Sequence, residues 1–365
     1  MRSLLLGVAL LGLRPGAPHN PRTQAPGPLV LVDSVRLVES DTFVLARPVQ
    51  VLAGPKGDVF IVDQRDARIA RVDRRGRLVG WIGRSGAGPG EFRRPATMAL
   101  SGDSLLSVWD LGLQRLSTWA LRTGRPIAAF PLGGWFPQLG YHEGRLRVGV
   151  LHTDSTPTVM TVALTGEGRR GEGRRPPLFD RSPPLIAGFG SVYFADDGPD
   201  VYGVFEVADQ LFHWRRGERA VNATNLPRRE RRGVRPDLFD ELMRDPAKAA
   251  AIAYDRSIPQ ALRRLQPGVL GLITLDGTLE QGRNFVGTLR LSVIDVSRRR
   301  ACIDLDIPGP RDPLPVATFA GDTLVVLRQG ERPDGTGESW LLRYHVDITR
   351  CTWQGLDRAT SLPPE

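Results

Sequence analysis

Acidic side chains in the first third of the chain stand where they could bind a ligand. Asp63, Asp66 and Asp110 lie at the ends of short apolar runs, beside turns. Carboxylates in such positions often accept hydrogen bonds from turn amides. They could also face a common opening and bind calcium, which prefers several oxygen ligands. Together with the neighbouring Arg68 and Arg115, they form the first group of candidate ligand-binding residues.

Two of the five histidines, His142 and His152, complete the candidate ligand-binding set. Their spacing allows them to lie on opposite strands of one hairpin, where two imidazoles could hold a metal ion. The alternative is that both are ordinary strand-end or surface histidines. Neither a Gly-x-Ser-x-Gly elbow nor a His-Glu-x-x-His motif occurs in the chain, so the common hydrolase signals are absent.

One glycine-rich run has the composition of a phosphate-binding loop. Its members are Gly86, Gly88, Pro89, Gly90, Glu91 and Phe92. A phosphate loop must lead from a strand into the N-terminus of a helix, whose amides hold the anion. Here Pro95 and another apolar run follow instead. We therefore expect a structural turn between two repeating units, in which Glu91 accepts hydrogen bonds from amides and Phe92 packs between the units.

The candidate residues lie on a repeating unit of short strands. Between Pro48 and Pro95, apolar runs at 59–62, 69–72 and 78–82 are separated by turn dipeptides such as Gly-Asp and Arg-Gly. Runs of this length with β-branched residues are typical of strands. A strand-turn-strand-turn-strand unit of about 45 residues is typical of a propeller blade.

The unit recurs five more times, with decreasing similarity to the first. The later units span about 95–132, 136–166, 184–225, 259–308 and 314–353. A strand at 29–38 is left over before the first unit and can supply the missing outer strand of the last one. Such closure removes exposed sheet edges. We therefore predict an all-β fold, a single six-bladed β-propeller closed by its N-terminal strand.

The first unit also carries the residues of a known repeat. They are Gly57, Val59, Phe60, Val62, Asp63, Arg68, Ile69, Asp73, Gly76, Ile82 and Gly83, followed by the glycine-rich run and Pro95. In this pattern the unit resembles an NHL repeat, and the second unit matches it in part. The chain as a whole is similar to the six-bladed, TolB-like propellers that bacteria export. This resemblance implies a fold and says little about function.

The composition is that of a globular, basic protein. The 365 residues are 41% hydrophobic, and their formal net charge is +9. A basic balance can indicate nucleic acid as a partner, but only two lysines occur, and arginine, alanine, glycine and proline are all abundant, as in GC-rich coding sequences. Aromatic residues do not alternate with the arginine clusters, as a single-strand stacking surface would require. Nucleic acid is therefore not the expected partner. Because no apolar run reaches the roughly 18 residues of a spanning helix, no membrane-spanning segment is predicted.

The ends of the chain and one internal segment depart from the repeat. Residues 1–28 contain an apolar run from Leu4 to Leu13 after a basic start, which predicts a secretory signal. The alternative is a misassigned start followed by a disordered arm. The propeller is expected to span 29–357, with a tail at 358–365. Residues 226–258 predict a small helical insertion between the fourth and fifth units, which either covers the channel or packs over a blade edge.

The only two cysteines are Cys302 and Cys351. Neither has a partner at metal-ligand spacing, so no zinc site is predicted. In an exported protein, an even pair suggests one disulfide. The alternative is two separate buried thiols.

These patterns favour an exported, non-catalytic binding or scaffold propeller that recognises a small ligand or a protein partner at its channel mouth. It is expected in the periplasm, on the outer surface or secreted, as a monomer. No cofactor is expected, although calcium or another divalent ion in the channel stays open. The alternative is a metal-dependent enzyme resembling lactonase-like or lyase-like propellers. A weaker alternative is an RNA-binding propeller of the NHL type.

Overall fold

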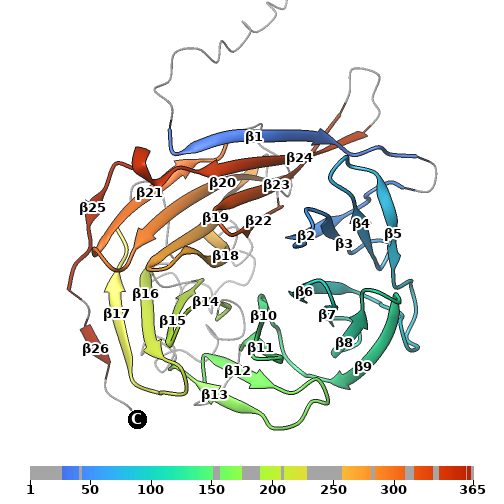
Figure 1. Cartoon of the computed structure of the whole chain (residues 1–365), viewed down its shortest axis with the longest axis horizontal. Coiled ribbons are helices and arrows are strands. Elements are labelled where there is room, and N and C mark those ends of the chain that lie inside the picture. The colour runs from blue at the N-terminus through green and yellow to red at the C-terminus, as the bar shows by residue number, and fades with distance from the viewer. Residues whose placement is uncertain are drawn as a thin grey trace, which may run out of the picture.

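The computed structural model describes residues 27–40, 43–150, 157–174, 190–206, 209–227, 257–280, 284–308, 316–331, 337–358 and 360–362. Within these ranges the chain forms six antiparallel sheets, which surround a common centre like the blades of a propeller (Figure 1). The predicted all-β, six-bladed propeller is therefore confirmed.

Each blade begins with its innermost strand and continues outward along the chain (Figure 1). Blade 1 contains β2 (Pro48–Ala53), β3 (Val59–Asp63), β4 (Arg68–Val72) and β5 (Leu78–Ile82). Blade 2 contains β6 (Pro95–Ser101), β7 (Leu105–Asp110), β8 (Arg115–Ala120) and β9 (Arg125–Pro131). Blade 3 contains β10 (Leu139–His142), β11 (Arg145–Gly149), β12 (Val159–Val162) and β13 (Arg170–Glu172).

The other three blades follow the same order. Blade 4 contains β14 (Val192–Asp197), β15 (Asp200–Phe205), β16 (Gln210–Arg215) and β17 (Val221–Asn225). Blade 5 contains β18 (Ser257–Gln266), β19 (Val269–Glu280), β20 (Asn284–Asp295) and β21 (Arg300–Asp306). Blade 6 contains β22 (Val316–Ala320), β23 (Thr323–Glu331) and β24 (Gly337–Val346) from this part of the chain.

The hairpin turns of the first two blades explain why their repeat is visible in the sequence. Gly57 joins β2 to β3 with a φ of +79°, and Gly102 joins β6 to β7 with a φ of +57°. Glycine adopts this left-handed conformation without the steric penalty that a Cβ atom brings. The two Gly-Asp turns are therefore equivalent positions of the same hairpin.

The hydrophobic core lies between the blades. One cluster joins blades 1 and 2 through side chains such as Phe60, Phe92 and Trp119. Further clusters join blades 2 and 3, 4 and 5, 5 and 6, and 6 and 1. Full burial of each large apolar side chain contributes about 1.5–3 kcal/mol, so neighbouring blades stabilise one another through their faces.

Both ends of the described chain add strands to blades formed by other segments. Strand β1 (Leu29–Arg36) pairs antiparallel with β24, from Leu29 opposite Val346 to Arg36 opposite Trp340, and is the fourth strand of blade 6. After blade 6, β25 (Gln354–Gly355) pairs with β21 of blade 5, and β26 (Thr360–Leu362) pairs with β17 of blade 4. The C-terminal segment therefore runs along the outside of two blades (Figure 1).

The glycine-rich run forms the link from blade 1 to blade 2. Phe92 is fully buried, with its ring 4.8 Å from that of Trp119. Glu91 accepts hydrogen bonds from the amide of Gly88 and from Arg84, and these bonds lower the pKa of its carboxyl. Arg115, at the start of β8, donates to the carbonyl oxygens of three residues of the link. These are Ala87 at 2.9 Å, Gly88 at 3.0 Å and Glu91 at 2.8 Å.

The C-terminal segment also brings the two cysteines together. Cys302 lies on β21, and Cys351 follows the short 3-10 helix η2 (Ile348–Arg350) just before β25. Both are free thiols, so the predicted disulfide is not formed in this structure. The thiols are hydrogen-bonded to each other, because β25 pairs beside Cys302, and this bond lowers the pKa of Cys302 and raises that of Cys351. The structure therefore agrees with the alternative of two unbonded thiols, except that Cys351 is only partly buried.

The predicted helical insertion at 226–258 falls almost wholly outside the described residues, which stop at 227 and resume at 257. In the part of the chain that the structure describes, no helix has the length and apolar character that crossing a membrane would require.

Arg115→Ala should lower the free energy of unfolding by about 2–3 kcal/mol, because the carbonyl oxygens of the link lose their charged donor. Urea unfolding followed by tryptophan fluorescence measures the change. Arg122→Ala is the matched control, since Arg122 is exposed on the turn after β8, and it should stay within about 0.5 kcal/mol of the unchanged protein. Equal stability of both variants would contradict this role of Arg115.

Candidate functional site

Asp63 and Asp110 occupy equivalent places at the ends of β3 and β7, and both are buried. Asp63 accepts hydrogen bonds from the backbone amides of Ala46 and Arg47, both at 3.0 Å. Asp110 accepts bonds from three backbone amides. These belong to Arg93 at 2.7 Å, Arg94 at 3.1 Å and Leu113 at 2.9 Å. In this arrangement each carboxylate anchors the segment that leads into the innermost strand of its own blade.

Asp66 and Arg68 lie at the surface of blade 1. Their side chains form an ion pair at 2.7 Å, and the guanidinium of Arg68 also lies 3.6 Å from the centre of the Trp81 ring. Arg115, the equivalent of Arg68 in blade 2, is directed into the link between the blades. The structure therefore does not bring these residues together around one cavity.

His142 lies at the end of β10, with its Nε2 atom 3.4 Å from a carboxylate oxygen of Glu143. Burial and the positive charge of Arg216 lower the pKa of His142. The second histidine of the predicted pair, His152, lies outside the described residues. Within those residues, no group of three or more His, Cys, Asp or Glu side chains is placed to hold a metal ion.

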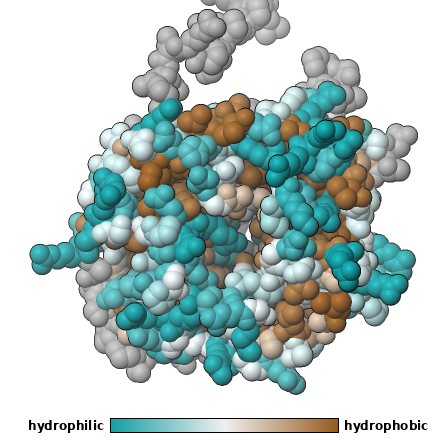
Figure 2. Space-filling model, viewed as in Figure 1, coloured by the Kyte–Doolittle hydropathy of each residue, from teal (hydrophilic) through white to brown (hydrophobic). Residues whose placement is uncertain are grey.

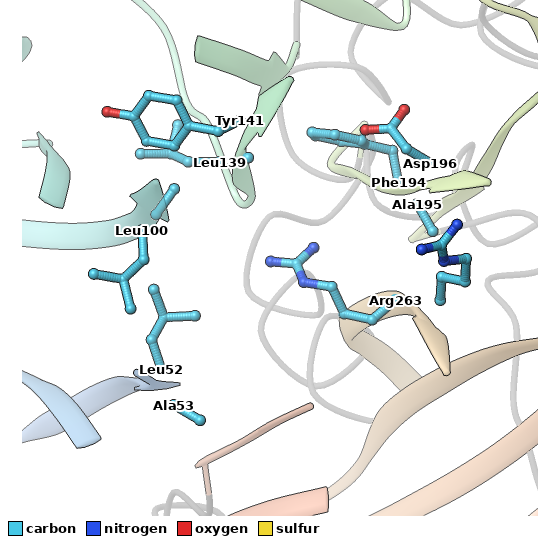
Figure 3. A pocket seen from close by; sticks show the side chains of 12 residues that line it. Leu52, Ala53, Leu100, Leu139, Tyr141, Phe194, Ala195, Asp196 and Arg263 are labelled. Atoms are coloured by element: carbon cyan, nitrogen blue, oxygen red, sulfur yellow. The ribbon is translucent and has the colours of Figure 1, made fainter. Parts of the chain in front are cut away.

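A cavity of about 340 Å³ lies where the inner strands of blades 1 to 5 end, and it is called the strand-end hollow below (Figure 3). The larger apolar side chains of its wall are Leu52, Leu100, Leu139 and Phe194. Arg263 projects into this space from β18 (Figure 3). The volume falls within the range of small-molecule sites, which is about 300–1,000 Å³.

A charged cluster between blades 3 and 4 reaches the same wall through one member, Asp196. The guanidinium of Arg147, on β11, is buried between the carboxylates of Glu172 and Asp196. Arg216 lies 3.4 Å from Asp196, and the amide of Gly217 donates to Glu172 at 2.6 Å. Burial, together with the nearby charge of Arg216, lowers the pKa of Arg147 to about 9. Two guanidinium groups thus face two carboxylates, and the cluster carries no net charge.

The two adjacent arginines of β18 differ in their surroundings. Arg264 lies 3.3 Å from a carboxylate oxygen of Asp197, which also accepts the amide of Gly268. Arg263 donates to the carbonyl of Leu262 at 3.2 Å, and among the described residues no carboxylate forms an ion pair with it. Burial lowers the pKa of Arg263 to about 10, so the group remains protonated at neutral pH.

A second cavity, of about 320 Å³, lies at the opposite ends of the inner strands and is called the strand-start hollow. Arg47, Arg94 and Trp135 lie at its exposed rim. Gln50 and Gln64 also line it, and both make hydrogen bonds to blade 2, at Met98 and Pro95. Asp63 and Asp110 therefore position the backbone of two rim arginines without lining the hollow themselves. The face of the molecule in Figure 2 is hollowed at the centre of the ring.

The side chains that give the strand-end hollow its charge were not among the predicted site residues. Arg263 and Arg264 stand within β18, where charged residues interrupt an apolar run. Such an interruption is the only signal that the sequence offers for either residue. It does not distinguish a channel-facing arginine from a solvent-facing one, because a shift of one residue in register reverses the side on which a side chain lies.

The fold and the hollows define a six-bladed β-propeller with ligand-sized cavities in its channel. No protein-family model matches the chain, and no curated relative matches it. The NHL and TolB-like resemblance therefore stays a prediction.

Several solved structures are similar in fold. A member of the duf4221 family from Bacteroides vulgatus ATCC 8482 is 10% identical, with a TM-score of 0.60 over 90% of this chain and 98% of that chain. A protein of Bacteroides fragilis NCTC 9343 that is named as exported is 10% identical, with a TM-score of 0.55 over 87% and 95%. U3-55K is 11% identical, with a TM-score of 0.52 over 86% and 99%. At these identities the likeness extends to the fold alone.

Asp63→Ala should lower the free energy of unfolding by about 2–3 kcal/mol, because two backbone amides lose a charged acceptor in a buried place. Asp66→Ala is the matched control. It removes an exposed ion pair and should cost less than about 1 kcal/mol. Denaturant unfolding of both variants measures the difference. An Asp63 variant as stable as the control would show that this carboxylate is free for another role.

Removal of divalent ions should leave the unfolding temperature unchanged to within about 1 °C, because no stabilising ion is then released from the folded state. The physical reason is that both oxygens of Asp63 and of Asp110 already accept backbone amides. Metal analysis of the purified protein and thermal unfolding with and without EDTA test this expectation. One calcium ion per chain together with a large fall in unfolding temperature would contradict it.

Proposed function

We propose that the chain is an extracytoplasmic, non-catalytic binding propeller that holds a small molecule in the strand-end hollow. One observation carries this proposal: a cavity of ligand size whose wall is assembled from the inner strands of five blades. Sites of this kind are concave, mostly apolar and equipped with a few polar groups. The wall of the strand-end hollow combines apolar side chains with the charged groups of Asp196, Arg263 and Arg264.

A rigid frame around the hollow supports a binding role. Polar side chains of the inner strands bond to the next blade of the ring. Gln50 accepts the amide of Met98, Thr97 donates to the carbonyl of Phe136, and Gln138 donates to that of Phe194. A site on such a frame is largely formed before the ligand arrives, which reduces the ordering cost of binding.

Two further observations support the proposal. The first favours a binding role over a catalytic one, and the second favours export of the protein from the cytoplasm. The carboxylates that could have formed a catalytic group, Asp63 and Asp110, are engaged with backbone amides. The chain begins with a basic residue and an apolar run from Leu4 to Leu13, as secretory signals do. The fold likeness to a protein named as exported is compatible with this location.

The proposal is tested by closing the hollow. A library of small acids, amines and neutral molecules is screened by thermal shift, and each hit is measured by calorimetry. In Leu100→Trp a larger side chain occupies the hollow, and hits should bind at least about tenfold more weakly, a loss of about 1.4 kcal/mol. Ile127→Trp, on the exposed outer strand β9, is the matched control and should bind hits normally.

Ala53→Leu, at another lining position, replaces Leu100→Trp if that variant does not fold. Hits that bind all these variants equally, or a library without hits, would contradict the proposed function.

A further inference from the structure

We infer that the ligand of the strand-end hollow is a small amphipathic monocarboxylate, whose carboxylate binds Arg263 and whose apolar body lies against Leu52, Leu100 and Leu139. This inference rests on the proposed function, because it names the class of molecule that the hollow takes.

The first argument is charge. Arg263 brings a positive charge into the ring, and its hydrogen bond goes to the carbonyl of its own neighbour, Leu262. The acidic group of the same wall, Asp196, is already held by Arg147 and Arg216 and is directed away from Arg263 (Figure 3). Arg263 is half-buried, and a charge that is partly removed from water without a partner is costly to folding. An anionic ligand removes that cost when it binds.

The neighbouring Arg264 has a structural role, because it forms an ion pair within the protein. Arg264 has Asp197 opposite it, and Asp197 in turn holds the amide of Gly268. Among the described residues nothing equivalent faces Arg263. Among the described residues, the difference between these two adjacent arginines leaves Arg263 free to bind an anion in the hollow.

The second argument concerns the kind of anion. A guanidinium presents a planar fork of N–H donors that matches the two oxygens of a carboxylate. One uncompensated positive charge neutralises one negative charge. A dianion would leave a net negative charge facing the carboxylate of Asp196 and an apolar wall. The hollow therefore favours a carboxylate with a single charge over a phosphate monoester or a dicarboxylate.

The third argument is the shape of the remaining wall. Leu52 and Leu100 lie across the hollow from Arg263, and Leu139 lies above them in the view of Figure 3. These side chains offer no hydrogen bonds, so the part of the ligand away from its carboxylate must be apolar. A volume of about 340 Å³ restricts that part to a short alkyl chain or a single aromatic ring.

The test uses matched probes in calorimetry on the full chain. The acids are octanoate and 3-phenylpropionate, their neutral counterparts are octanamide and 3-phenylpropionamide, and the dianion is octanedioate. The unchanged protein should bind the monocarboxylates at least about tenfold more tightly than the amides or the dianion, because a charge-assisted bond is lost with each replacement.

The variants separate the role of Arg263 from that of its neighbour. Arg263→Gln should weaken monocarboxylate binding by about 10- to 100-fold and leave the amides within about twofold. Arg264→Gln is the matched control. Arg264 also lines the hollow but is paired with Asp197, so its loss should weaken monocarboxylate binding much less than the loss of Arg263 does. Arg263→Lys keeps the charge without the fork and should give intermediate binding.

A measurement without ligand tests the uncompensated charge. Arg263→Met should unfold at a higher temperature than the unchanged protein, because an unpaired and half-buried charge is removed. Arg264→Met should unfold at a lower temperature, because Asp197 loses its partner. A lower unfolding temperature for Arg263→Met would give Arg263 a structural role and overturn the inference.

The outcomes distinguish the inference from the proposed function. Equal binding of acids and amides, or of the unchanged protein and Arg263→Gln, overturns the carboxylate assignment. If acids and amides bind equally well and both lose their binding in Leu100→Trp, the hollow remains a ligand site, but for a class of ligand other than monocarboxylates. If none of the probes binds, the carboxylate inference is overturned, and the library screen alone decides the proposed function.

Discussion

The structure depends on the fact that a blade has two apolar faces and can bury them only against other blades. The clusters between blades 1 and 2, 2 and 3, 4 and 5, 5 and 6, and 6 and 1 contain many of the large buried side chains of the described residues. Burial of such side chains is the main favourable contribution to folding. Because each face needs a neighbour, the blades are arranged in a ring, and the ring surrounds a central space.

Strands from both ends of the described chain pair with the outer edges of three blades. The outer strand of blade 6, β1, comes from the start of the described chain, so residues far apart in sequence share one sheet. Strands β25 and β26 then cover the outer edges of blades 5 and 4. Paired edges no longer offer free backbone groups to other chains. The same C-terminal segment places Cys351 beside Cys302.

Buried charge is handled differently in two parts of one hollow. Between blades 3 and 4, Arg147 is enclosed with carboxylates and the opposite charges are equal in number. On β18, Arg263 is half-buried without an acidic partner among the described residues. The first arrangement joins two blades. In the second, the charge of Arg263 can still form an ion pair with a ligand. Functional sites often keep such locally unfavourable features.

The sequence alone indicated the features that depend on local interactions. The Gly-Asp turns at Gly57 and Gly102, the short β-branched runs and the link ending at Phe92 arise from neighbouring residues, and they were sufficient to predict six blades. From the sequence alone, Asp63 and Asp110 could not be assigned to structural or ligand-binding roles, because most of their partners are backbone amides 16 or 17 residues away. Only the tertiary structure decided which side chains meet in the channel. Leu52, Leu139 and Arg263 come from three blades, and strand register and the packing of the ring, neither of which is local, bring them to one cavity.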